Sequence, residues 1–450
     1  MRADLAKAYG QDRLPRYTSY PTAPHFSPSI SDATYRTWLQ ALPAQQRASL
    51  YVHVPFCRTM CWYCGCHTTL TKRDDPVTAY VAALRAEARL IAGVIGQLLP
   101  ISHIAFGGGT PTIMSPACFV DLMGTLRSAY AVLPDAEIAV EIDPRTLTAE
   151  MTEALGICGV NRASLGVQSF DPAVQQAIHR VQSFDQTAAA VTGLREAGVR
   201  KINFDLLYGL PLQTVESCLD TVAQCIELRP DRLSVFGYAH IPSFKKHQRK
   251  IADDSLPDST ERHLQSEAIA DALVHAGYAR IGLDHFALPE DNLAIALQNG
   301  RLHRNFQGYT DDDATTLIGL GASAIGRTPH GFVQNAVSTH DYLAHIAADR
   351  LAIAKGYQLT ADDRYRADLI ERIMCDMTVD LPEISRLHGV DPDHAIINRA
   401  RVESLIADGA VTMVDNCLSV RDGAEFLVRS VASAFDAHLA QSTATHSRAV

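Results

Sequence analysis

Between Ser49 and Gly282 the chain alternates short β-rich runs with longer runs that have helical spacing. This alternation is typical of βα units, in which parallel strands form a sheet and the connecting helices cover it. The expected strands are 50–54, 103–106, 138–142, 162–167, 202–206, 233–236 and 278–282. The expected helices are 77–95, 116–130, 149–158, 184–197 and 215–228. Gly198 and Gly277 stand where a helix should end. The pattern predicts an α/β fold, and periodicity alone leaves open a full barrel, a partial barrel or a doubly wound sheet.

Five of the expected strands are followed at once by polar or glycine-rich residues. In each of these architectures, ligands bind at the carboxyl ends of the parallel strands. Residues at those ends are, in chain order, Cys57, 107–110, Asp143, Gln168 and 208–211. Because the ends of parallel strands meet at one edge of a sheet, these residues predict a single ligand site there.

The chain is expected to divide into four regions. Residues 1–35 form an arm that reaches the active site, since 16–24 are rich in Tyr, Thr and Pro and lack helical period. Residues 36–300 are the βα core. Residues 301–358 connect it onward and include a polar, aromatic run at 302–309 that is expected to line the site. Residues 359–450 are expected to form a smaller, mostly helical, winged-helix-like domain with a hairpin around Asp415 and Asn416.

Charge and hydropathy exclude several classes of partner. A formal net charge of −10 and a pI near 6.0 argue against a nucleic-acid binder, so we expect a small-molecule partner. No apolar stretch approaches the ~18 residues that a membrane-spanning helix needs, and residues 1–16 are too charged for a secretory signal. We therefore expect a cytoplasmic protein without a membrane partner. The absence of coiled-coil heptads favours a monomer.

Four of the ten cysteines crowd between Cys57 and Cys66. Spacings of three and then two residues let Cys57, Cys61 and Cys64 converge on one face of an iron–sulfur cluster. Three ligands leave one of four irons open, as a catalytic metal requires. Cys66 is either a fourth ligand or points away. The alternatives are a structural zinc site or unpaired core cysteines, and zinc is disfavoured because no second Cys-x2-Cys pair exists.

Other candidate residues lie near this loop. Tyr51 and His53 are two apart on a strand, so both face one side, where they could relay protons or hold a substrate. His53 could equally be a satisfied core histidine. The glycines at 107–109 let backbone approach a ligand, although glycine runs are as often plain turns. Glu141 could be a solvated strand end. Arg180 would pair with a carboxylate if it faces the site.

The cysteine loop, with the aromatic Tyr63 before its last cysteine, resembles that of the radical S-adenosylmethionine (radical SAM) superfamily. This resemblance implies a partial or full (β/α) barrel core that holds a [4Fe-4S] cluster on Cys57, Cys61 and Cys64. It also implies that the cofactor's methionine amino and carboxylate groups chelate the open iron. One electron from the cluster then breaks a sulfur–carbon bond and releases a 5′-deoxyadenosyl radical.

A narrower resemblance rests on segments 51–57, 64–66, 16–22 and 303–310 taken together. Over nearly the whole chain the sequence is similar to the oxygen-independent coproporphyrinogen III oxidase family. This resemblance implies two molecules of S-adenosyl-L-methionine. The residues expected to contact the first molecule are Tyr51, Gly108, Glu141, Ala239 and Ile325. The residues expected to contact the second molecule are Tyr63, Gly109, Thr110, Gln168, Arg180 and Asp205. Tyr51 and His53 are the candidate catalytic residues.

The implied reaction belongs to heme biosynthesis. Two propionates of coproporphyrinogen III would be oxidatively decarboxylated to vinyl groups, giving protoporphyrinogen IX, with an electron donor and an acceptor that the sequence does not identify. Arg16 and Arg304, and more weakly Arg249, are candidate partners for the substrate's four carboxylates. The rival interpretations are a related radical SAM heme chaperone and another radical SAM enzyme, such as a methyltransferase.

Overall fold

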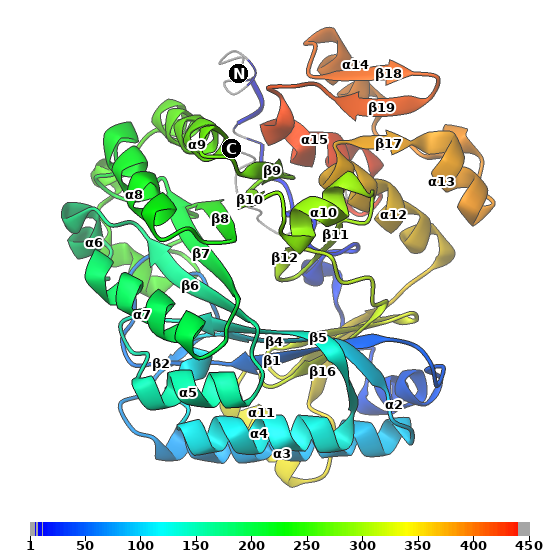
Figure 1. The fold of residues 1–450 in the computed structure, drawn as a ribbon. Helices are drawn as coiled ribbons and strands as arrows, with labels where there is room; N and C mark the ends of the chain where they lie inside the picture. The colour runs from blue at the N-terminus through cyan, green and yellow to red at the C-terminus, as the bar shows by residue number, and fades with distance from the viewer. Residues whose placement is uncertain (1–4, 6–7, 11, 440–450) are drawn as a thin grey trace.

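The computed structural model of the chain describes residue 5, residues 8–10 and residues 12–439. Its centre is a twelve-stranded sheet that bends strongly between the strands at the base of Figure 1 and those that rise on its left. Six neighbouring strands run parallel and in chain order: β1 (Ala48–Val54), β4 (Pro100–Gly108), β5 (Ala131–Ile142), β6 (Arg162–Gln168), β7 (Lys201–Tyr208) and β8 (Arg232–Gly237). The edge strands of this sheet do not pair with each other, so the core is a partial barrel.

Both edges of the sheet are extended by other strands. β13 (Thr316–Leu320) pairs parallel with β1, and three antiparallel strands follow: β14 (Ile325–Thr328), β15 (Gly331–Asn335) and β16 (Ile353–Gln358). Beyond β8 lie β10 (His285–Ala287) and β9 (Ala279–Ile281), both antiparallel to their neighbours. The sequence predicts 278–282 as a member of the parallel series. That orientation is wrong, because the short link from β9 to β10 is long enough only for a hairpin.

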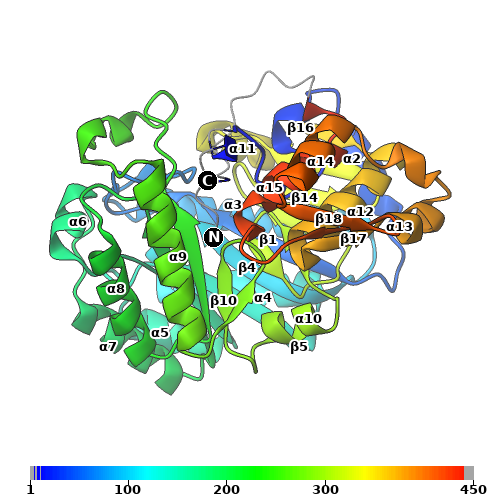
Figure 2. The same ribbon diagram turned by 90° about the horizontal axis from the view of Figure 1, so that it is seen from above.

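Each strand from β5 to β8 has one apolar face and one polar face, because successive side chains point to opposite sides. The apolar set belongs to the main hydrophobic core and lies under the helices: Ile138, Val140, Ile142, Ala163, Leu165, Val167, Ile202, Phe204, Leu206, Leu233 and Val235. The helices that cover the barrel are α3 (Asp75–Ile95), α4 (Pro116–Ala129), α5 (Ala149–Ile157), α6 (Pro172–Ala177), α7 (Phe184–Glu196), α8 (Val215–Glu227) and α9 (Ser259–His275). Figures 1 and 2 show them outside the sheet, which leaves the polar face on the concave side.

The five expected helices of the core are confirmed to within two residues at each end. Four of the five starts are fixed by hydroxyl caps: Ser115, Thr148, Ser183 and Thr214 each accept a hydrogen bond from a backbone N–H of the first turn. α7 and α9 end just before Gly198 and Gly277, whose φ angles of 94° and 93° lie in the left-handed region that favours glycine.

The last part of the chain forms a second hydrophobic core. It contains α12 (Ala361–Asp376), α13 (Leu381–His388), α14 (Arg399–Ala407), α15 (Val428–Ala432) and a small sheet of β17 (Thr378–Asp380), β19 (Cys417–Val420) and β18 (Val411–Val414). The expected hairpin turns at Asp415 and Asn416, both with positive φ. Figure 2 shows this part beside the barrel, opposite α5 to α9.

The N-terminal arm packs on this second core through three tyrosines, and further along the chain it meets the sheet, where Ser27 pairs with Gly356 of β16. Tyr9, Tyr17 and Tyr20 belong to the same hydrophobic cluster as the buried residues of α12 and α15. The Tyr17 hydroxyl donates to an oxygen of Asp436 at 3.0 Å. The remaining elements are α2 (Asp32–Gln40), α10 (Asn292–Gln298), α11 (Thr339–Ala347) and the short strands β2 (Phe56–Cys57), β3 (Thr69–Leu70), β11 (His303–Asn305) and β12 (Gly308–Thr310). In the described part of the chain, no helix has the length and apolar character needed to cross a membrane.

Candidate active site

A cavity of about 1100 Å³ occupies the concave face of the sheet. Most of its lining on four strands consists of alternate residues, which do not belong to the set that faces the helices: Glu137, Ala139, Glu141, Arg162, Ser164, Gly166, Gln168, Asn203, Asp205, Leu207, Arg232, Ser234 and Phe236. Val140 and Ile142 of the helix-facing set also border the cavity near the end of β5. Seven Lys or Arg side chains against four Asp or Glu side chains line the cavity, although the whole chain carries a net charge of −10. The site therefore attracts anions locally.

The cysteine loop follows β1 and β2 and lies at the rim of this cavity. Cys57, Cys61, Cys64 and Cys66 all line the cavity, and none forms a disulfide. Each sulfur of the first three has a hydrogen-bond donor or hydroxyl within 3.5 Å: Thr68 and Thr110 near Cys57, Arg145 and Arg180 near Cys61, and the backbone N–H of Cys66 near Cys64. Hydrogen bonds to sulfur favour the thiolate form and tune cluster potentials.

The donor set at the cysteine loop consists of thiols, which are the ligands that iron–sulfur clusters use. Among the described residues, no three Cys, His, Asp or Glu side chains gather closely enough to hold one metal ion. In a cubane each cysteine binds a different iron, so its sulfurs stand apart around one face. Cys57, Cys61 and Cys64 are the candidate ligands, and the guanidinium groups of Arg145 and Arg180 beside the Cys61 sulfur would balance a cluster's negative charge.

A second segment covers the cysteine loop from the β8 side. Three nearby side chains donate to backbone carbonyls of the loop: Lys245 to Cys66 at 2.9 Å, His247 to Cys64 at 2.7 Å and Gln248 to Tyr63 at 3.0 Å. These contacts fix the loop without using its sulfurs. The sequence does not predict these contacts, because residues 245–250 look like a solvated run of charge when only the sequence is known.

Tyr51 and His53 form a chain of hydrogen bonds beside the loop. His53 Nε2 lies 3.2 Å from the His67 carbonyl oxygen, which can only accept, so Nε2 carries the proton. The other ring nitrogen, Nδ1, is then an acceptor for the Tyr51 hydroxyl at 3.0 Å. Burial lowers the pKa of His53 to about 4, so the ring is neutral near pH 7. Tyr51 lines the cavity, whereas His53 stands behind it.

Glu141 meets the glycine run at the end of β4. The Gly108 N–H donates to the Glu141 carboxylate at 3.0 Å. A side chain at Gly107 would bring its Cβ to 2.7 Å from that carboxylate, and one at Gly108, whose φ is 114°, would bring it to 2.6 Å from the His53 ring. Glycine is therefore required where these groups converge. Burial, with a contribution from Asp205, raises the pKa of Glu141 to about 7.

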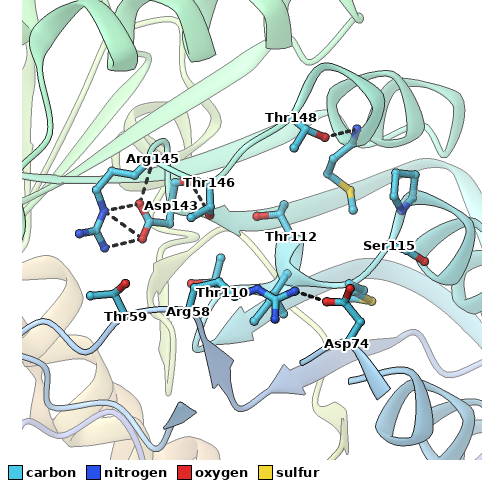
Figure 3. Close-up of a pocket in the computed structure, with 14 residues that line it drawn as sticks. Arg58, Thr59, Asp74, Thr110, Thr112, Ser115, Asp143, Arg145, Thr146 and Thr148 are labelled. Atoms are coloured by element: carbon cyan, nitrogen blue, oxygen red, sulfur yellow. Dashed lines mark hydrogen bonds and ion pairs between the residues drawn. The ribbon is translucent and has the colours of Figure 1, made fainter. Parts of the chain in front are cut away.

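Asp143 forms the centre of a charged wall after β5. Arg145 contacts its carboxylate at 2.6 Å and Arg180 contacts it at 3.4 Å. Burial raises the pKa of Asp143, but the two arginines outweigh burial and lower it overall. Figure 3 shows Asp143 and Arg145 bordering a side pocket of about 540 Å³, whose lining shares Thr59, Thr110, Asp143 and Arg145 with the main cavity. Arg145 was missed from sequence, although its place two residues after Asp143 was a signal.

The structure brings most of the predicted site residues together. Those that line the cavity are Tyr51, Cys57, Cys61, Tyr63, Cys64, Gly108, Gly109, Thr110, Glu141, Gln168, Arg180, Asp205 and Ala239. Ile325 is not in its lining and lies on β14, two strands beyond β1.

The three predicted substrate arginines fall in different places. Arg16 is exposed and lines the cavity. Arg304 is buried outside the lining, with its guanidinium 4.3 Å from the centre of the Tyr309 ring and 3.9 Å from Asp284. Arg249 is on the surface, where Nε donates to the Pro242 carbonyl. Of these three arginines, only Arg16 lines the cavity.

Comparison with known proteins places these features in context. The family model of the radical SAM superfamily matches residues 51–225. The chain is 60% identical over 450 residues to the oxygen-independent coproporphyrinogen III oxidase of Bradyrhizobium diazoefficiens, with 100% of both chains covered. It is 42% identical to the protein of that name from Paracoccus denitrificans, with 95% of this chain and 94% of the relative covered. The solved structure of coproporphyrinogen III oxidase from Escherichia coli, described as a radical SAM enzyme, aligns with a TM-score of 0.91 and 36% identity over 97% of this chain and 99% of that chain.

Proposed function

Because the chain belongs to the family of oxygen-independent coproporphyrinogen III oxidases, we propose that it oxidatively decarboxylates coproporphyrinogen III to protoporphyrinogen IX in heme biosynthesis. The strongest support within the molecule is that three cysteines, Cys57, Cys61 and Cys64, open into one large, locally basic cavity. That cavity joins a redox centre to a place where a multiply charged anion can bind.

Cys57, Cys61 and Cys64 would hold the [4Fe-4S] cluster, and two molecules of S-adenosyl-L-methionine would bind beside it. When bound, these groups supply an adenosyl carbon radical that takes hydrogen from an unactivated C–H bond. In each turnover a propionate loses one hydrogen from its β-carbon, its carboxyl group as carbon dioxide, and one electron to an acceptor. Two such turnovers give the two vinyl groups.

The residues around the glycine run would orient the first S-adenosyl-L-methionine. Glu141 holds the Gly108 N–H, and Tyr51 stands against the same glycines. Since the Tyr51 O–H donates to His53, its oxygen offers lone pairs, not a proton, to a ligand in the cavity. His53 therefore acts as a positioning residue for Tyr51. Ala239 lines the same cavity, and Ile325 would need to reach the cofactor from β14.

The other side of the cavity would hold the second S-adenosyl-L-methionine. Tyr63 comes from the cysteine loop, Gln168 from the end of β6, Arg180 from the segment after α6, and Asp205 from within β7. The Asp205 carboxylate accepts from Ser164 at 2.8 Å and from Asn203 at 2.9 Å, which fixes its direction. A fixed carboxylate and a buried guanidinium suit the opposite charges of a zwitterionic amino acid group.

The remaining assignments are part of the same proposal. The electron donor and acceptor are separate partners, and the protein acts as a monomer in the cytoplasm. A heme chaperone or a methyltransferase on the same core is disfavoured, because the matched relatives carry the oxidase name along their full length.

An anaerobic assay tests this function. The reconstituted, reduced protein is incubated with S-adenosyl-L-methionine and coproporphyrinogen III, and protoporphyrin and 5′-deoxyadenosine are measured together. We expect both products in the wild type and neither in Cys61→Ala. Formation of 5′-deoxyadenosine with tight heme binding but without protoporphyrin would contradict the oxidase assignment and favour the chaperone.

A further inference from the structure

Two arginines line the deep part of the cavity, far from the cysteine loop. Arg162 is the first residue of β6 and Arg232 the first residue of β8, and their exposed fractions are 5% and 7%. Both point to the concave face, since they lie on the polar side of the strand alternation. The sequence analysis did not single them out, because a charge at a strand start usually faces solvent.

Carboxylates of the protein hold one side of each guanidinium. Arg162 Nε lies 2.9 Å from Glu137, and its Nη2 lies 3.4 Å from Asp291. Arg232 Nε forms a close ion pair with the same Asp291, which is fully buried. The two arginines therefore share one buried carboxylate and have fixed orientations.

The other side of each guanidinium has no partner within the described part of the chain. Arg162 Nη1 and Arg232 Nη2 are buried nitrogens without a hydrogen bond, and Arg162 Nε has only its ion-pair contact with Glu137. A guanidinium has five N–H donors and no acceptor, so these atoms require an oxygen from elsewhere. Leaving a buried charged donor unpaired is costly, and native proteins rarely do so without a functional reason.

The position of the two arginines indicates which part of a ligand they meet. Arg162 precedes Gln168 by six residues on one strand, roughly 20 Å at about 3.3 Å per residue. Gln168 is at the carboxyl end of β6, where Arg180 donates to the nearby Gly166 carbonyl at 2.6 Å and lies 3.5 Å from the Cys61 sulfur. A group held by Arg162 is therefore remote from the place where a radical would form, so it is a binding group and not a reacting one.

We propose that Arg162 and Arg232 form a carboxylate subsite, which binds a propionate of the tetrapyrrole that is not the one being decarboxylated. This subsite rests on the proposed function for the identity of its ligand. Planar guanidinium groups match the two oxygens of a carboxylate, and a tetracarboxylate substrate always presents a propionate away from the reacting carbon. The subsite would determine how deeply the tetrapyrrole ring enters the cavity.

The test compares substitutions that keep the buried charge balanced. Arg232→Lys retains the positive charge beside Asp291 but removes Nη2, and Arg232→Gln with Asp291→Asn removes both charges together. Arg229→Lys is the matched control, because Arg229 is 75% exposed and pairs with Glu290 at the surface. Binding of coproporphyrin III, the oxidised analogue, is measured by fluorescence titration of each variant without S-adenosyl-L-methionine.

We expect binding weaker by roughly 10- to 100-fold in both Arg232 variants and unchanged in Arg229→Lys. The tetramethyl ester, which has no carboxylate, should bind all proteins equally. Iron content and substrate-independent formation of 5′-deoxyadenosine should stay at wild-type levels. Wild-type affinity in both folded Arg232 variants, or the same loss for acid and ester, would overturn the subsite. If the wild type binds coproporphyrin in this manner but makes no protoporphyrin, the oxidase assignment fails and the subsite stands.

Discussion

The two faces of strands β5 to β8 differ in almost every physical respect. On the outer face Val140, Leu165 and Phe204 are at most 1% exposed and belong to one apolar core under the helices. On the inner face, one residue away along the same strands, Glu141, Ser164 and Asp205 line the cavity. The same backbone therefore carries a face that stabilises the fold and a face that binds ligands.

Stability and function therefore depend on different residues of these strands, which alternate along the chain. Outer residues contribute through burial of apolar area, at about 25 cal/mol per Å². Inner residues reduce stability, because burial removes polar groups from water and only hydrogen bonds offset that cost. Some of these groups remain unpaired until a ligand binds. We therefore expect substitutions on the outer face to lower stability with little effect on activity. Substitutions on the inner face should lower activity with little effect on stability.

The largest expected effect is on the cysteine loop. Cys64→Ala should reduce iron content and product formation to background, while the free energy of unfolding of the iron-free protein changes by about 1 kcal/mol or less. Cys118→Ala is the matched control, because Cys118 is a half-buried cysteine on α4 outside the cavity. Iron analysis and chemical denaturation of both variants check this. Equal iron content in the two variants would refute the ligand role.

The largest effect on stability is expected on the outer face. Phe204→Ala should destabilise the fold by about 3–5 kcal/mol, because it removes a fully buried ring and leaves a cavity. Its neighbour Asp205, substituted as Asp205→Asn, keeps its volume and should change stability far less. Denaturant titration measures both. Activity per folded molecule should persist in Phe204→Ala, and a loss there would show that the faces are coupled.

Glu141→Gln tests the inner face, where we expect a loss of activity without a loss of stability. We expect activity lower by about 100-fold, since the amide cannot replace a carboxylate that orients the cofactor. Stability should stay equal or rise, because burial raises the pKa of Glu141 to about 7 and so disfavours its charged form. Steady-state kinetics and thermal unfolding on the same preparation separate the two effects. Lower stability with intact activity would contradict the account.

The smallest effect concerns a buried carboxyl outside the site. Glu87 on α3 accepts from the Gly321 N–H, the Tyr342 hydroxyl and Asn335, and burial raises its pKa to about 7 from an ordinary 4.5. The native state then binds this proton more tightly than the unfolded state, so stability falls as pH rises from about 4.5 through 7.

Glu87→Gln should remove this share of the pH dependence, making the decline between pH 5 and 8 shallower by roughly 2 kcal/mol. Urea unfolding at several pH values measures it. Activity should not follow the same curve, because Glu87 is not among the residues that line the cavity. An identical pH dependence of stability in both proteins would show that Glu87 titrates normally.

Most of the barrel could be predicted from the sequence because local patterns determine it. The helix expected at 77–95 runs from Asp75 to Ile95, and the strand expected at 162–167 runs from Arg162 to Gln168. Alternating apolar residues, hydroxyl caps and terminal glycines set these bounds, and all three act within a few residues of the chain. The prediction of the cysteine loop was equally local, since it rested on the spacing of three cysteines that all line the cavity.

What the sequence could not predict depends on contacts between distant segments. β13 joins β1 across more than 260 residues, and β9 turns antiparallel at the opposite edge; neither pairing has a local signal. Arg304 was expected to meet substrate, but its burial against Tyr309 follows from the packing of β11 and β12 on α12. Arg162 and Arg232 are 70 residues apart in the sequence, and only the curved sheet brings both into the lining of one cavity.

The central claim is that a radical formed at the cysteine loop takes hydrogen from a propionate of the bound tetrapyrrole. Coproporphyrinogen III deuterated at the propionate β-carbons tests it most directly in a single anaerobic turnover. The account predicts that the 5′-deoxyadenosine formed gains one deuterium, in step with protoporphyrinogen formation. Unlabelled 5′-deoxyadenosine, with the deuterated substrate recovered intact, would contradict it.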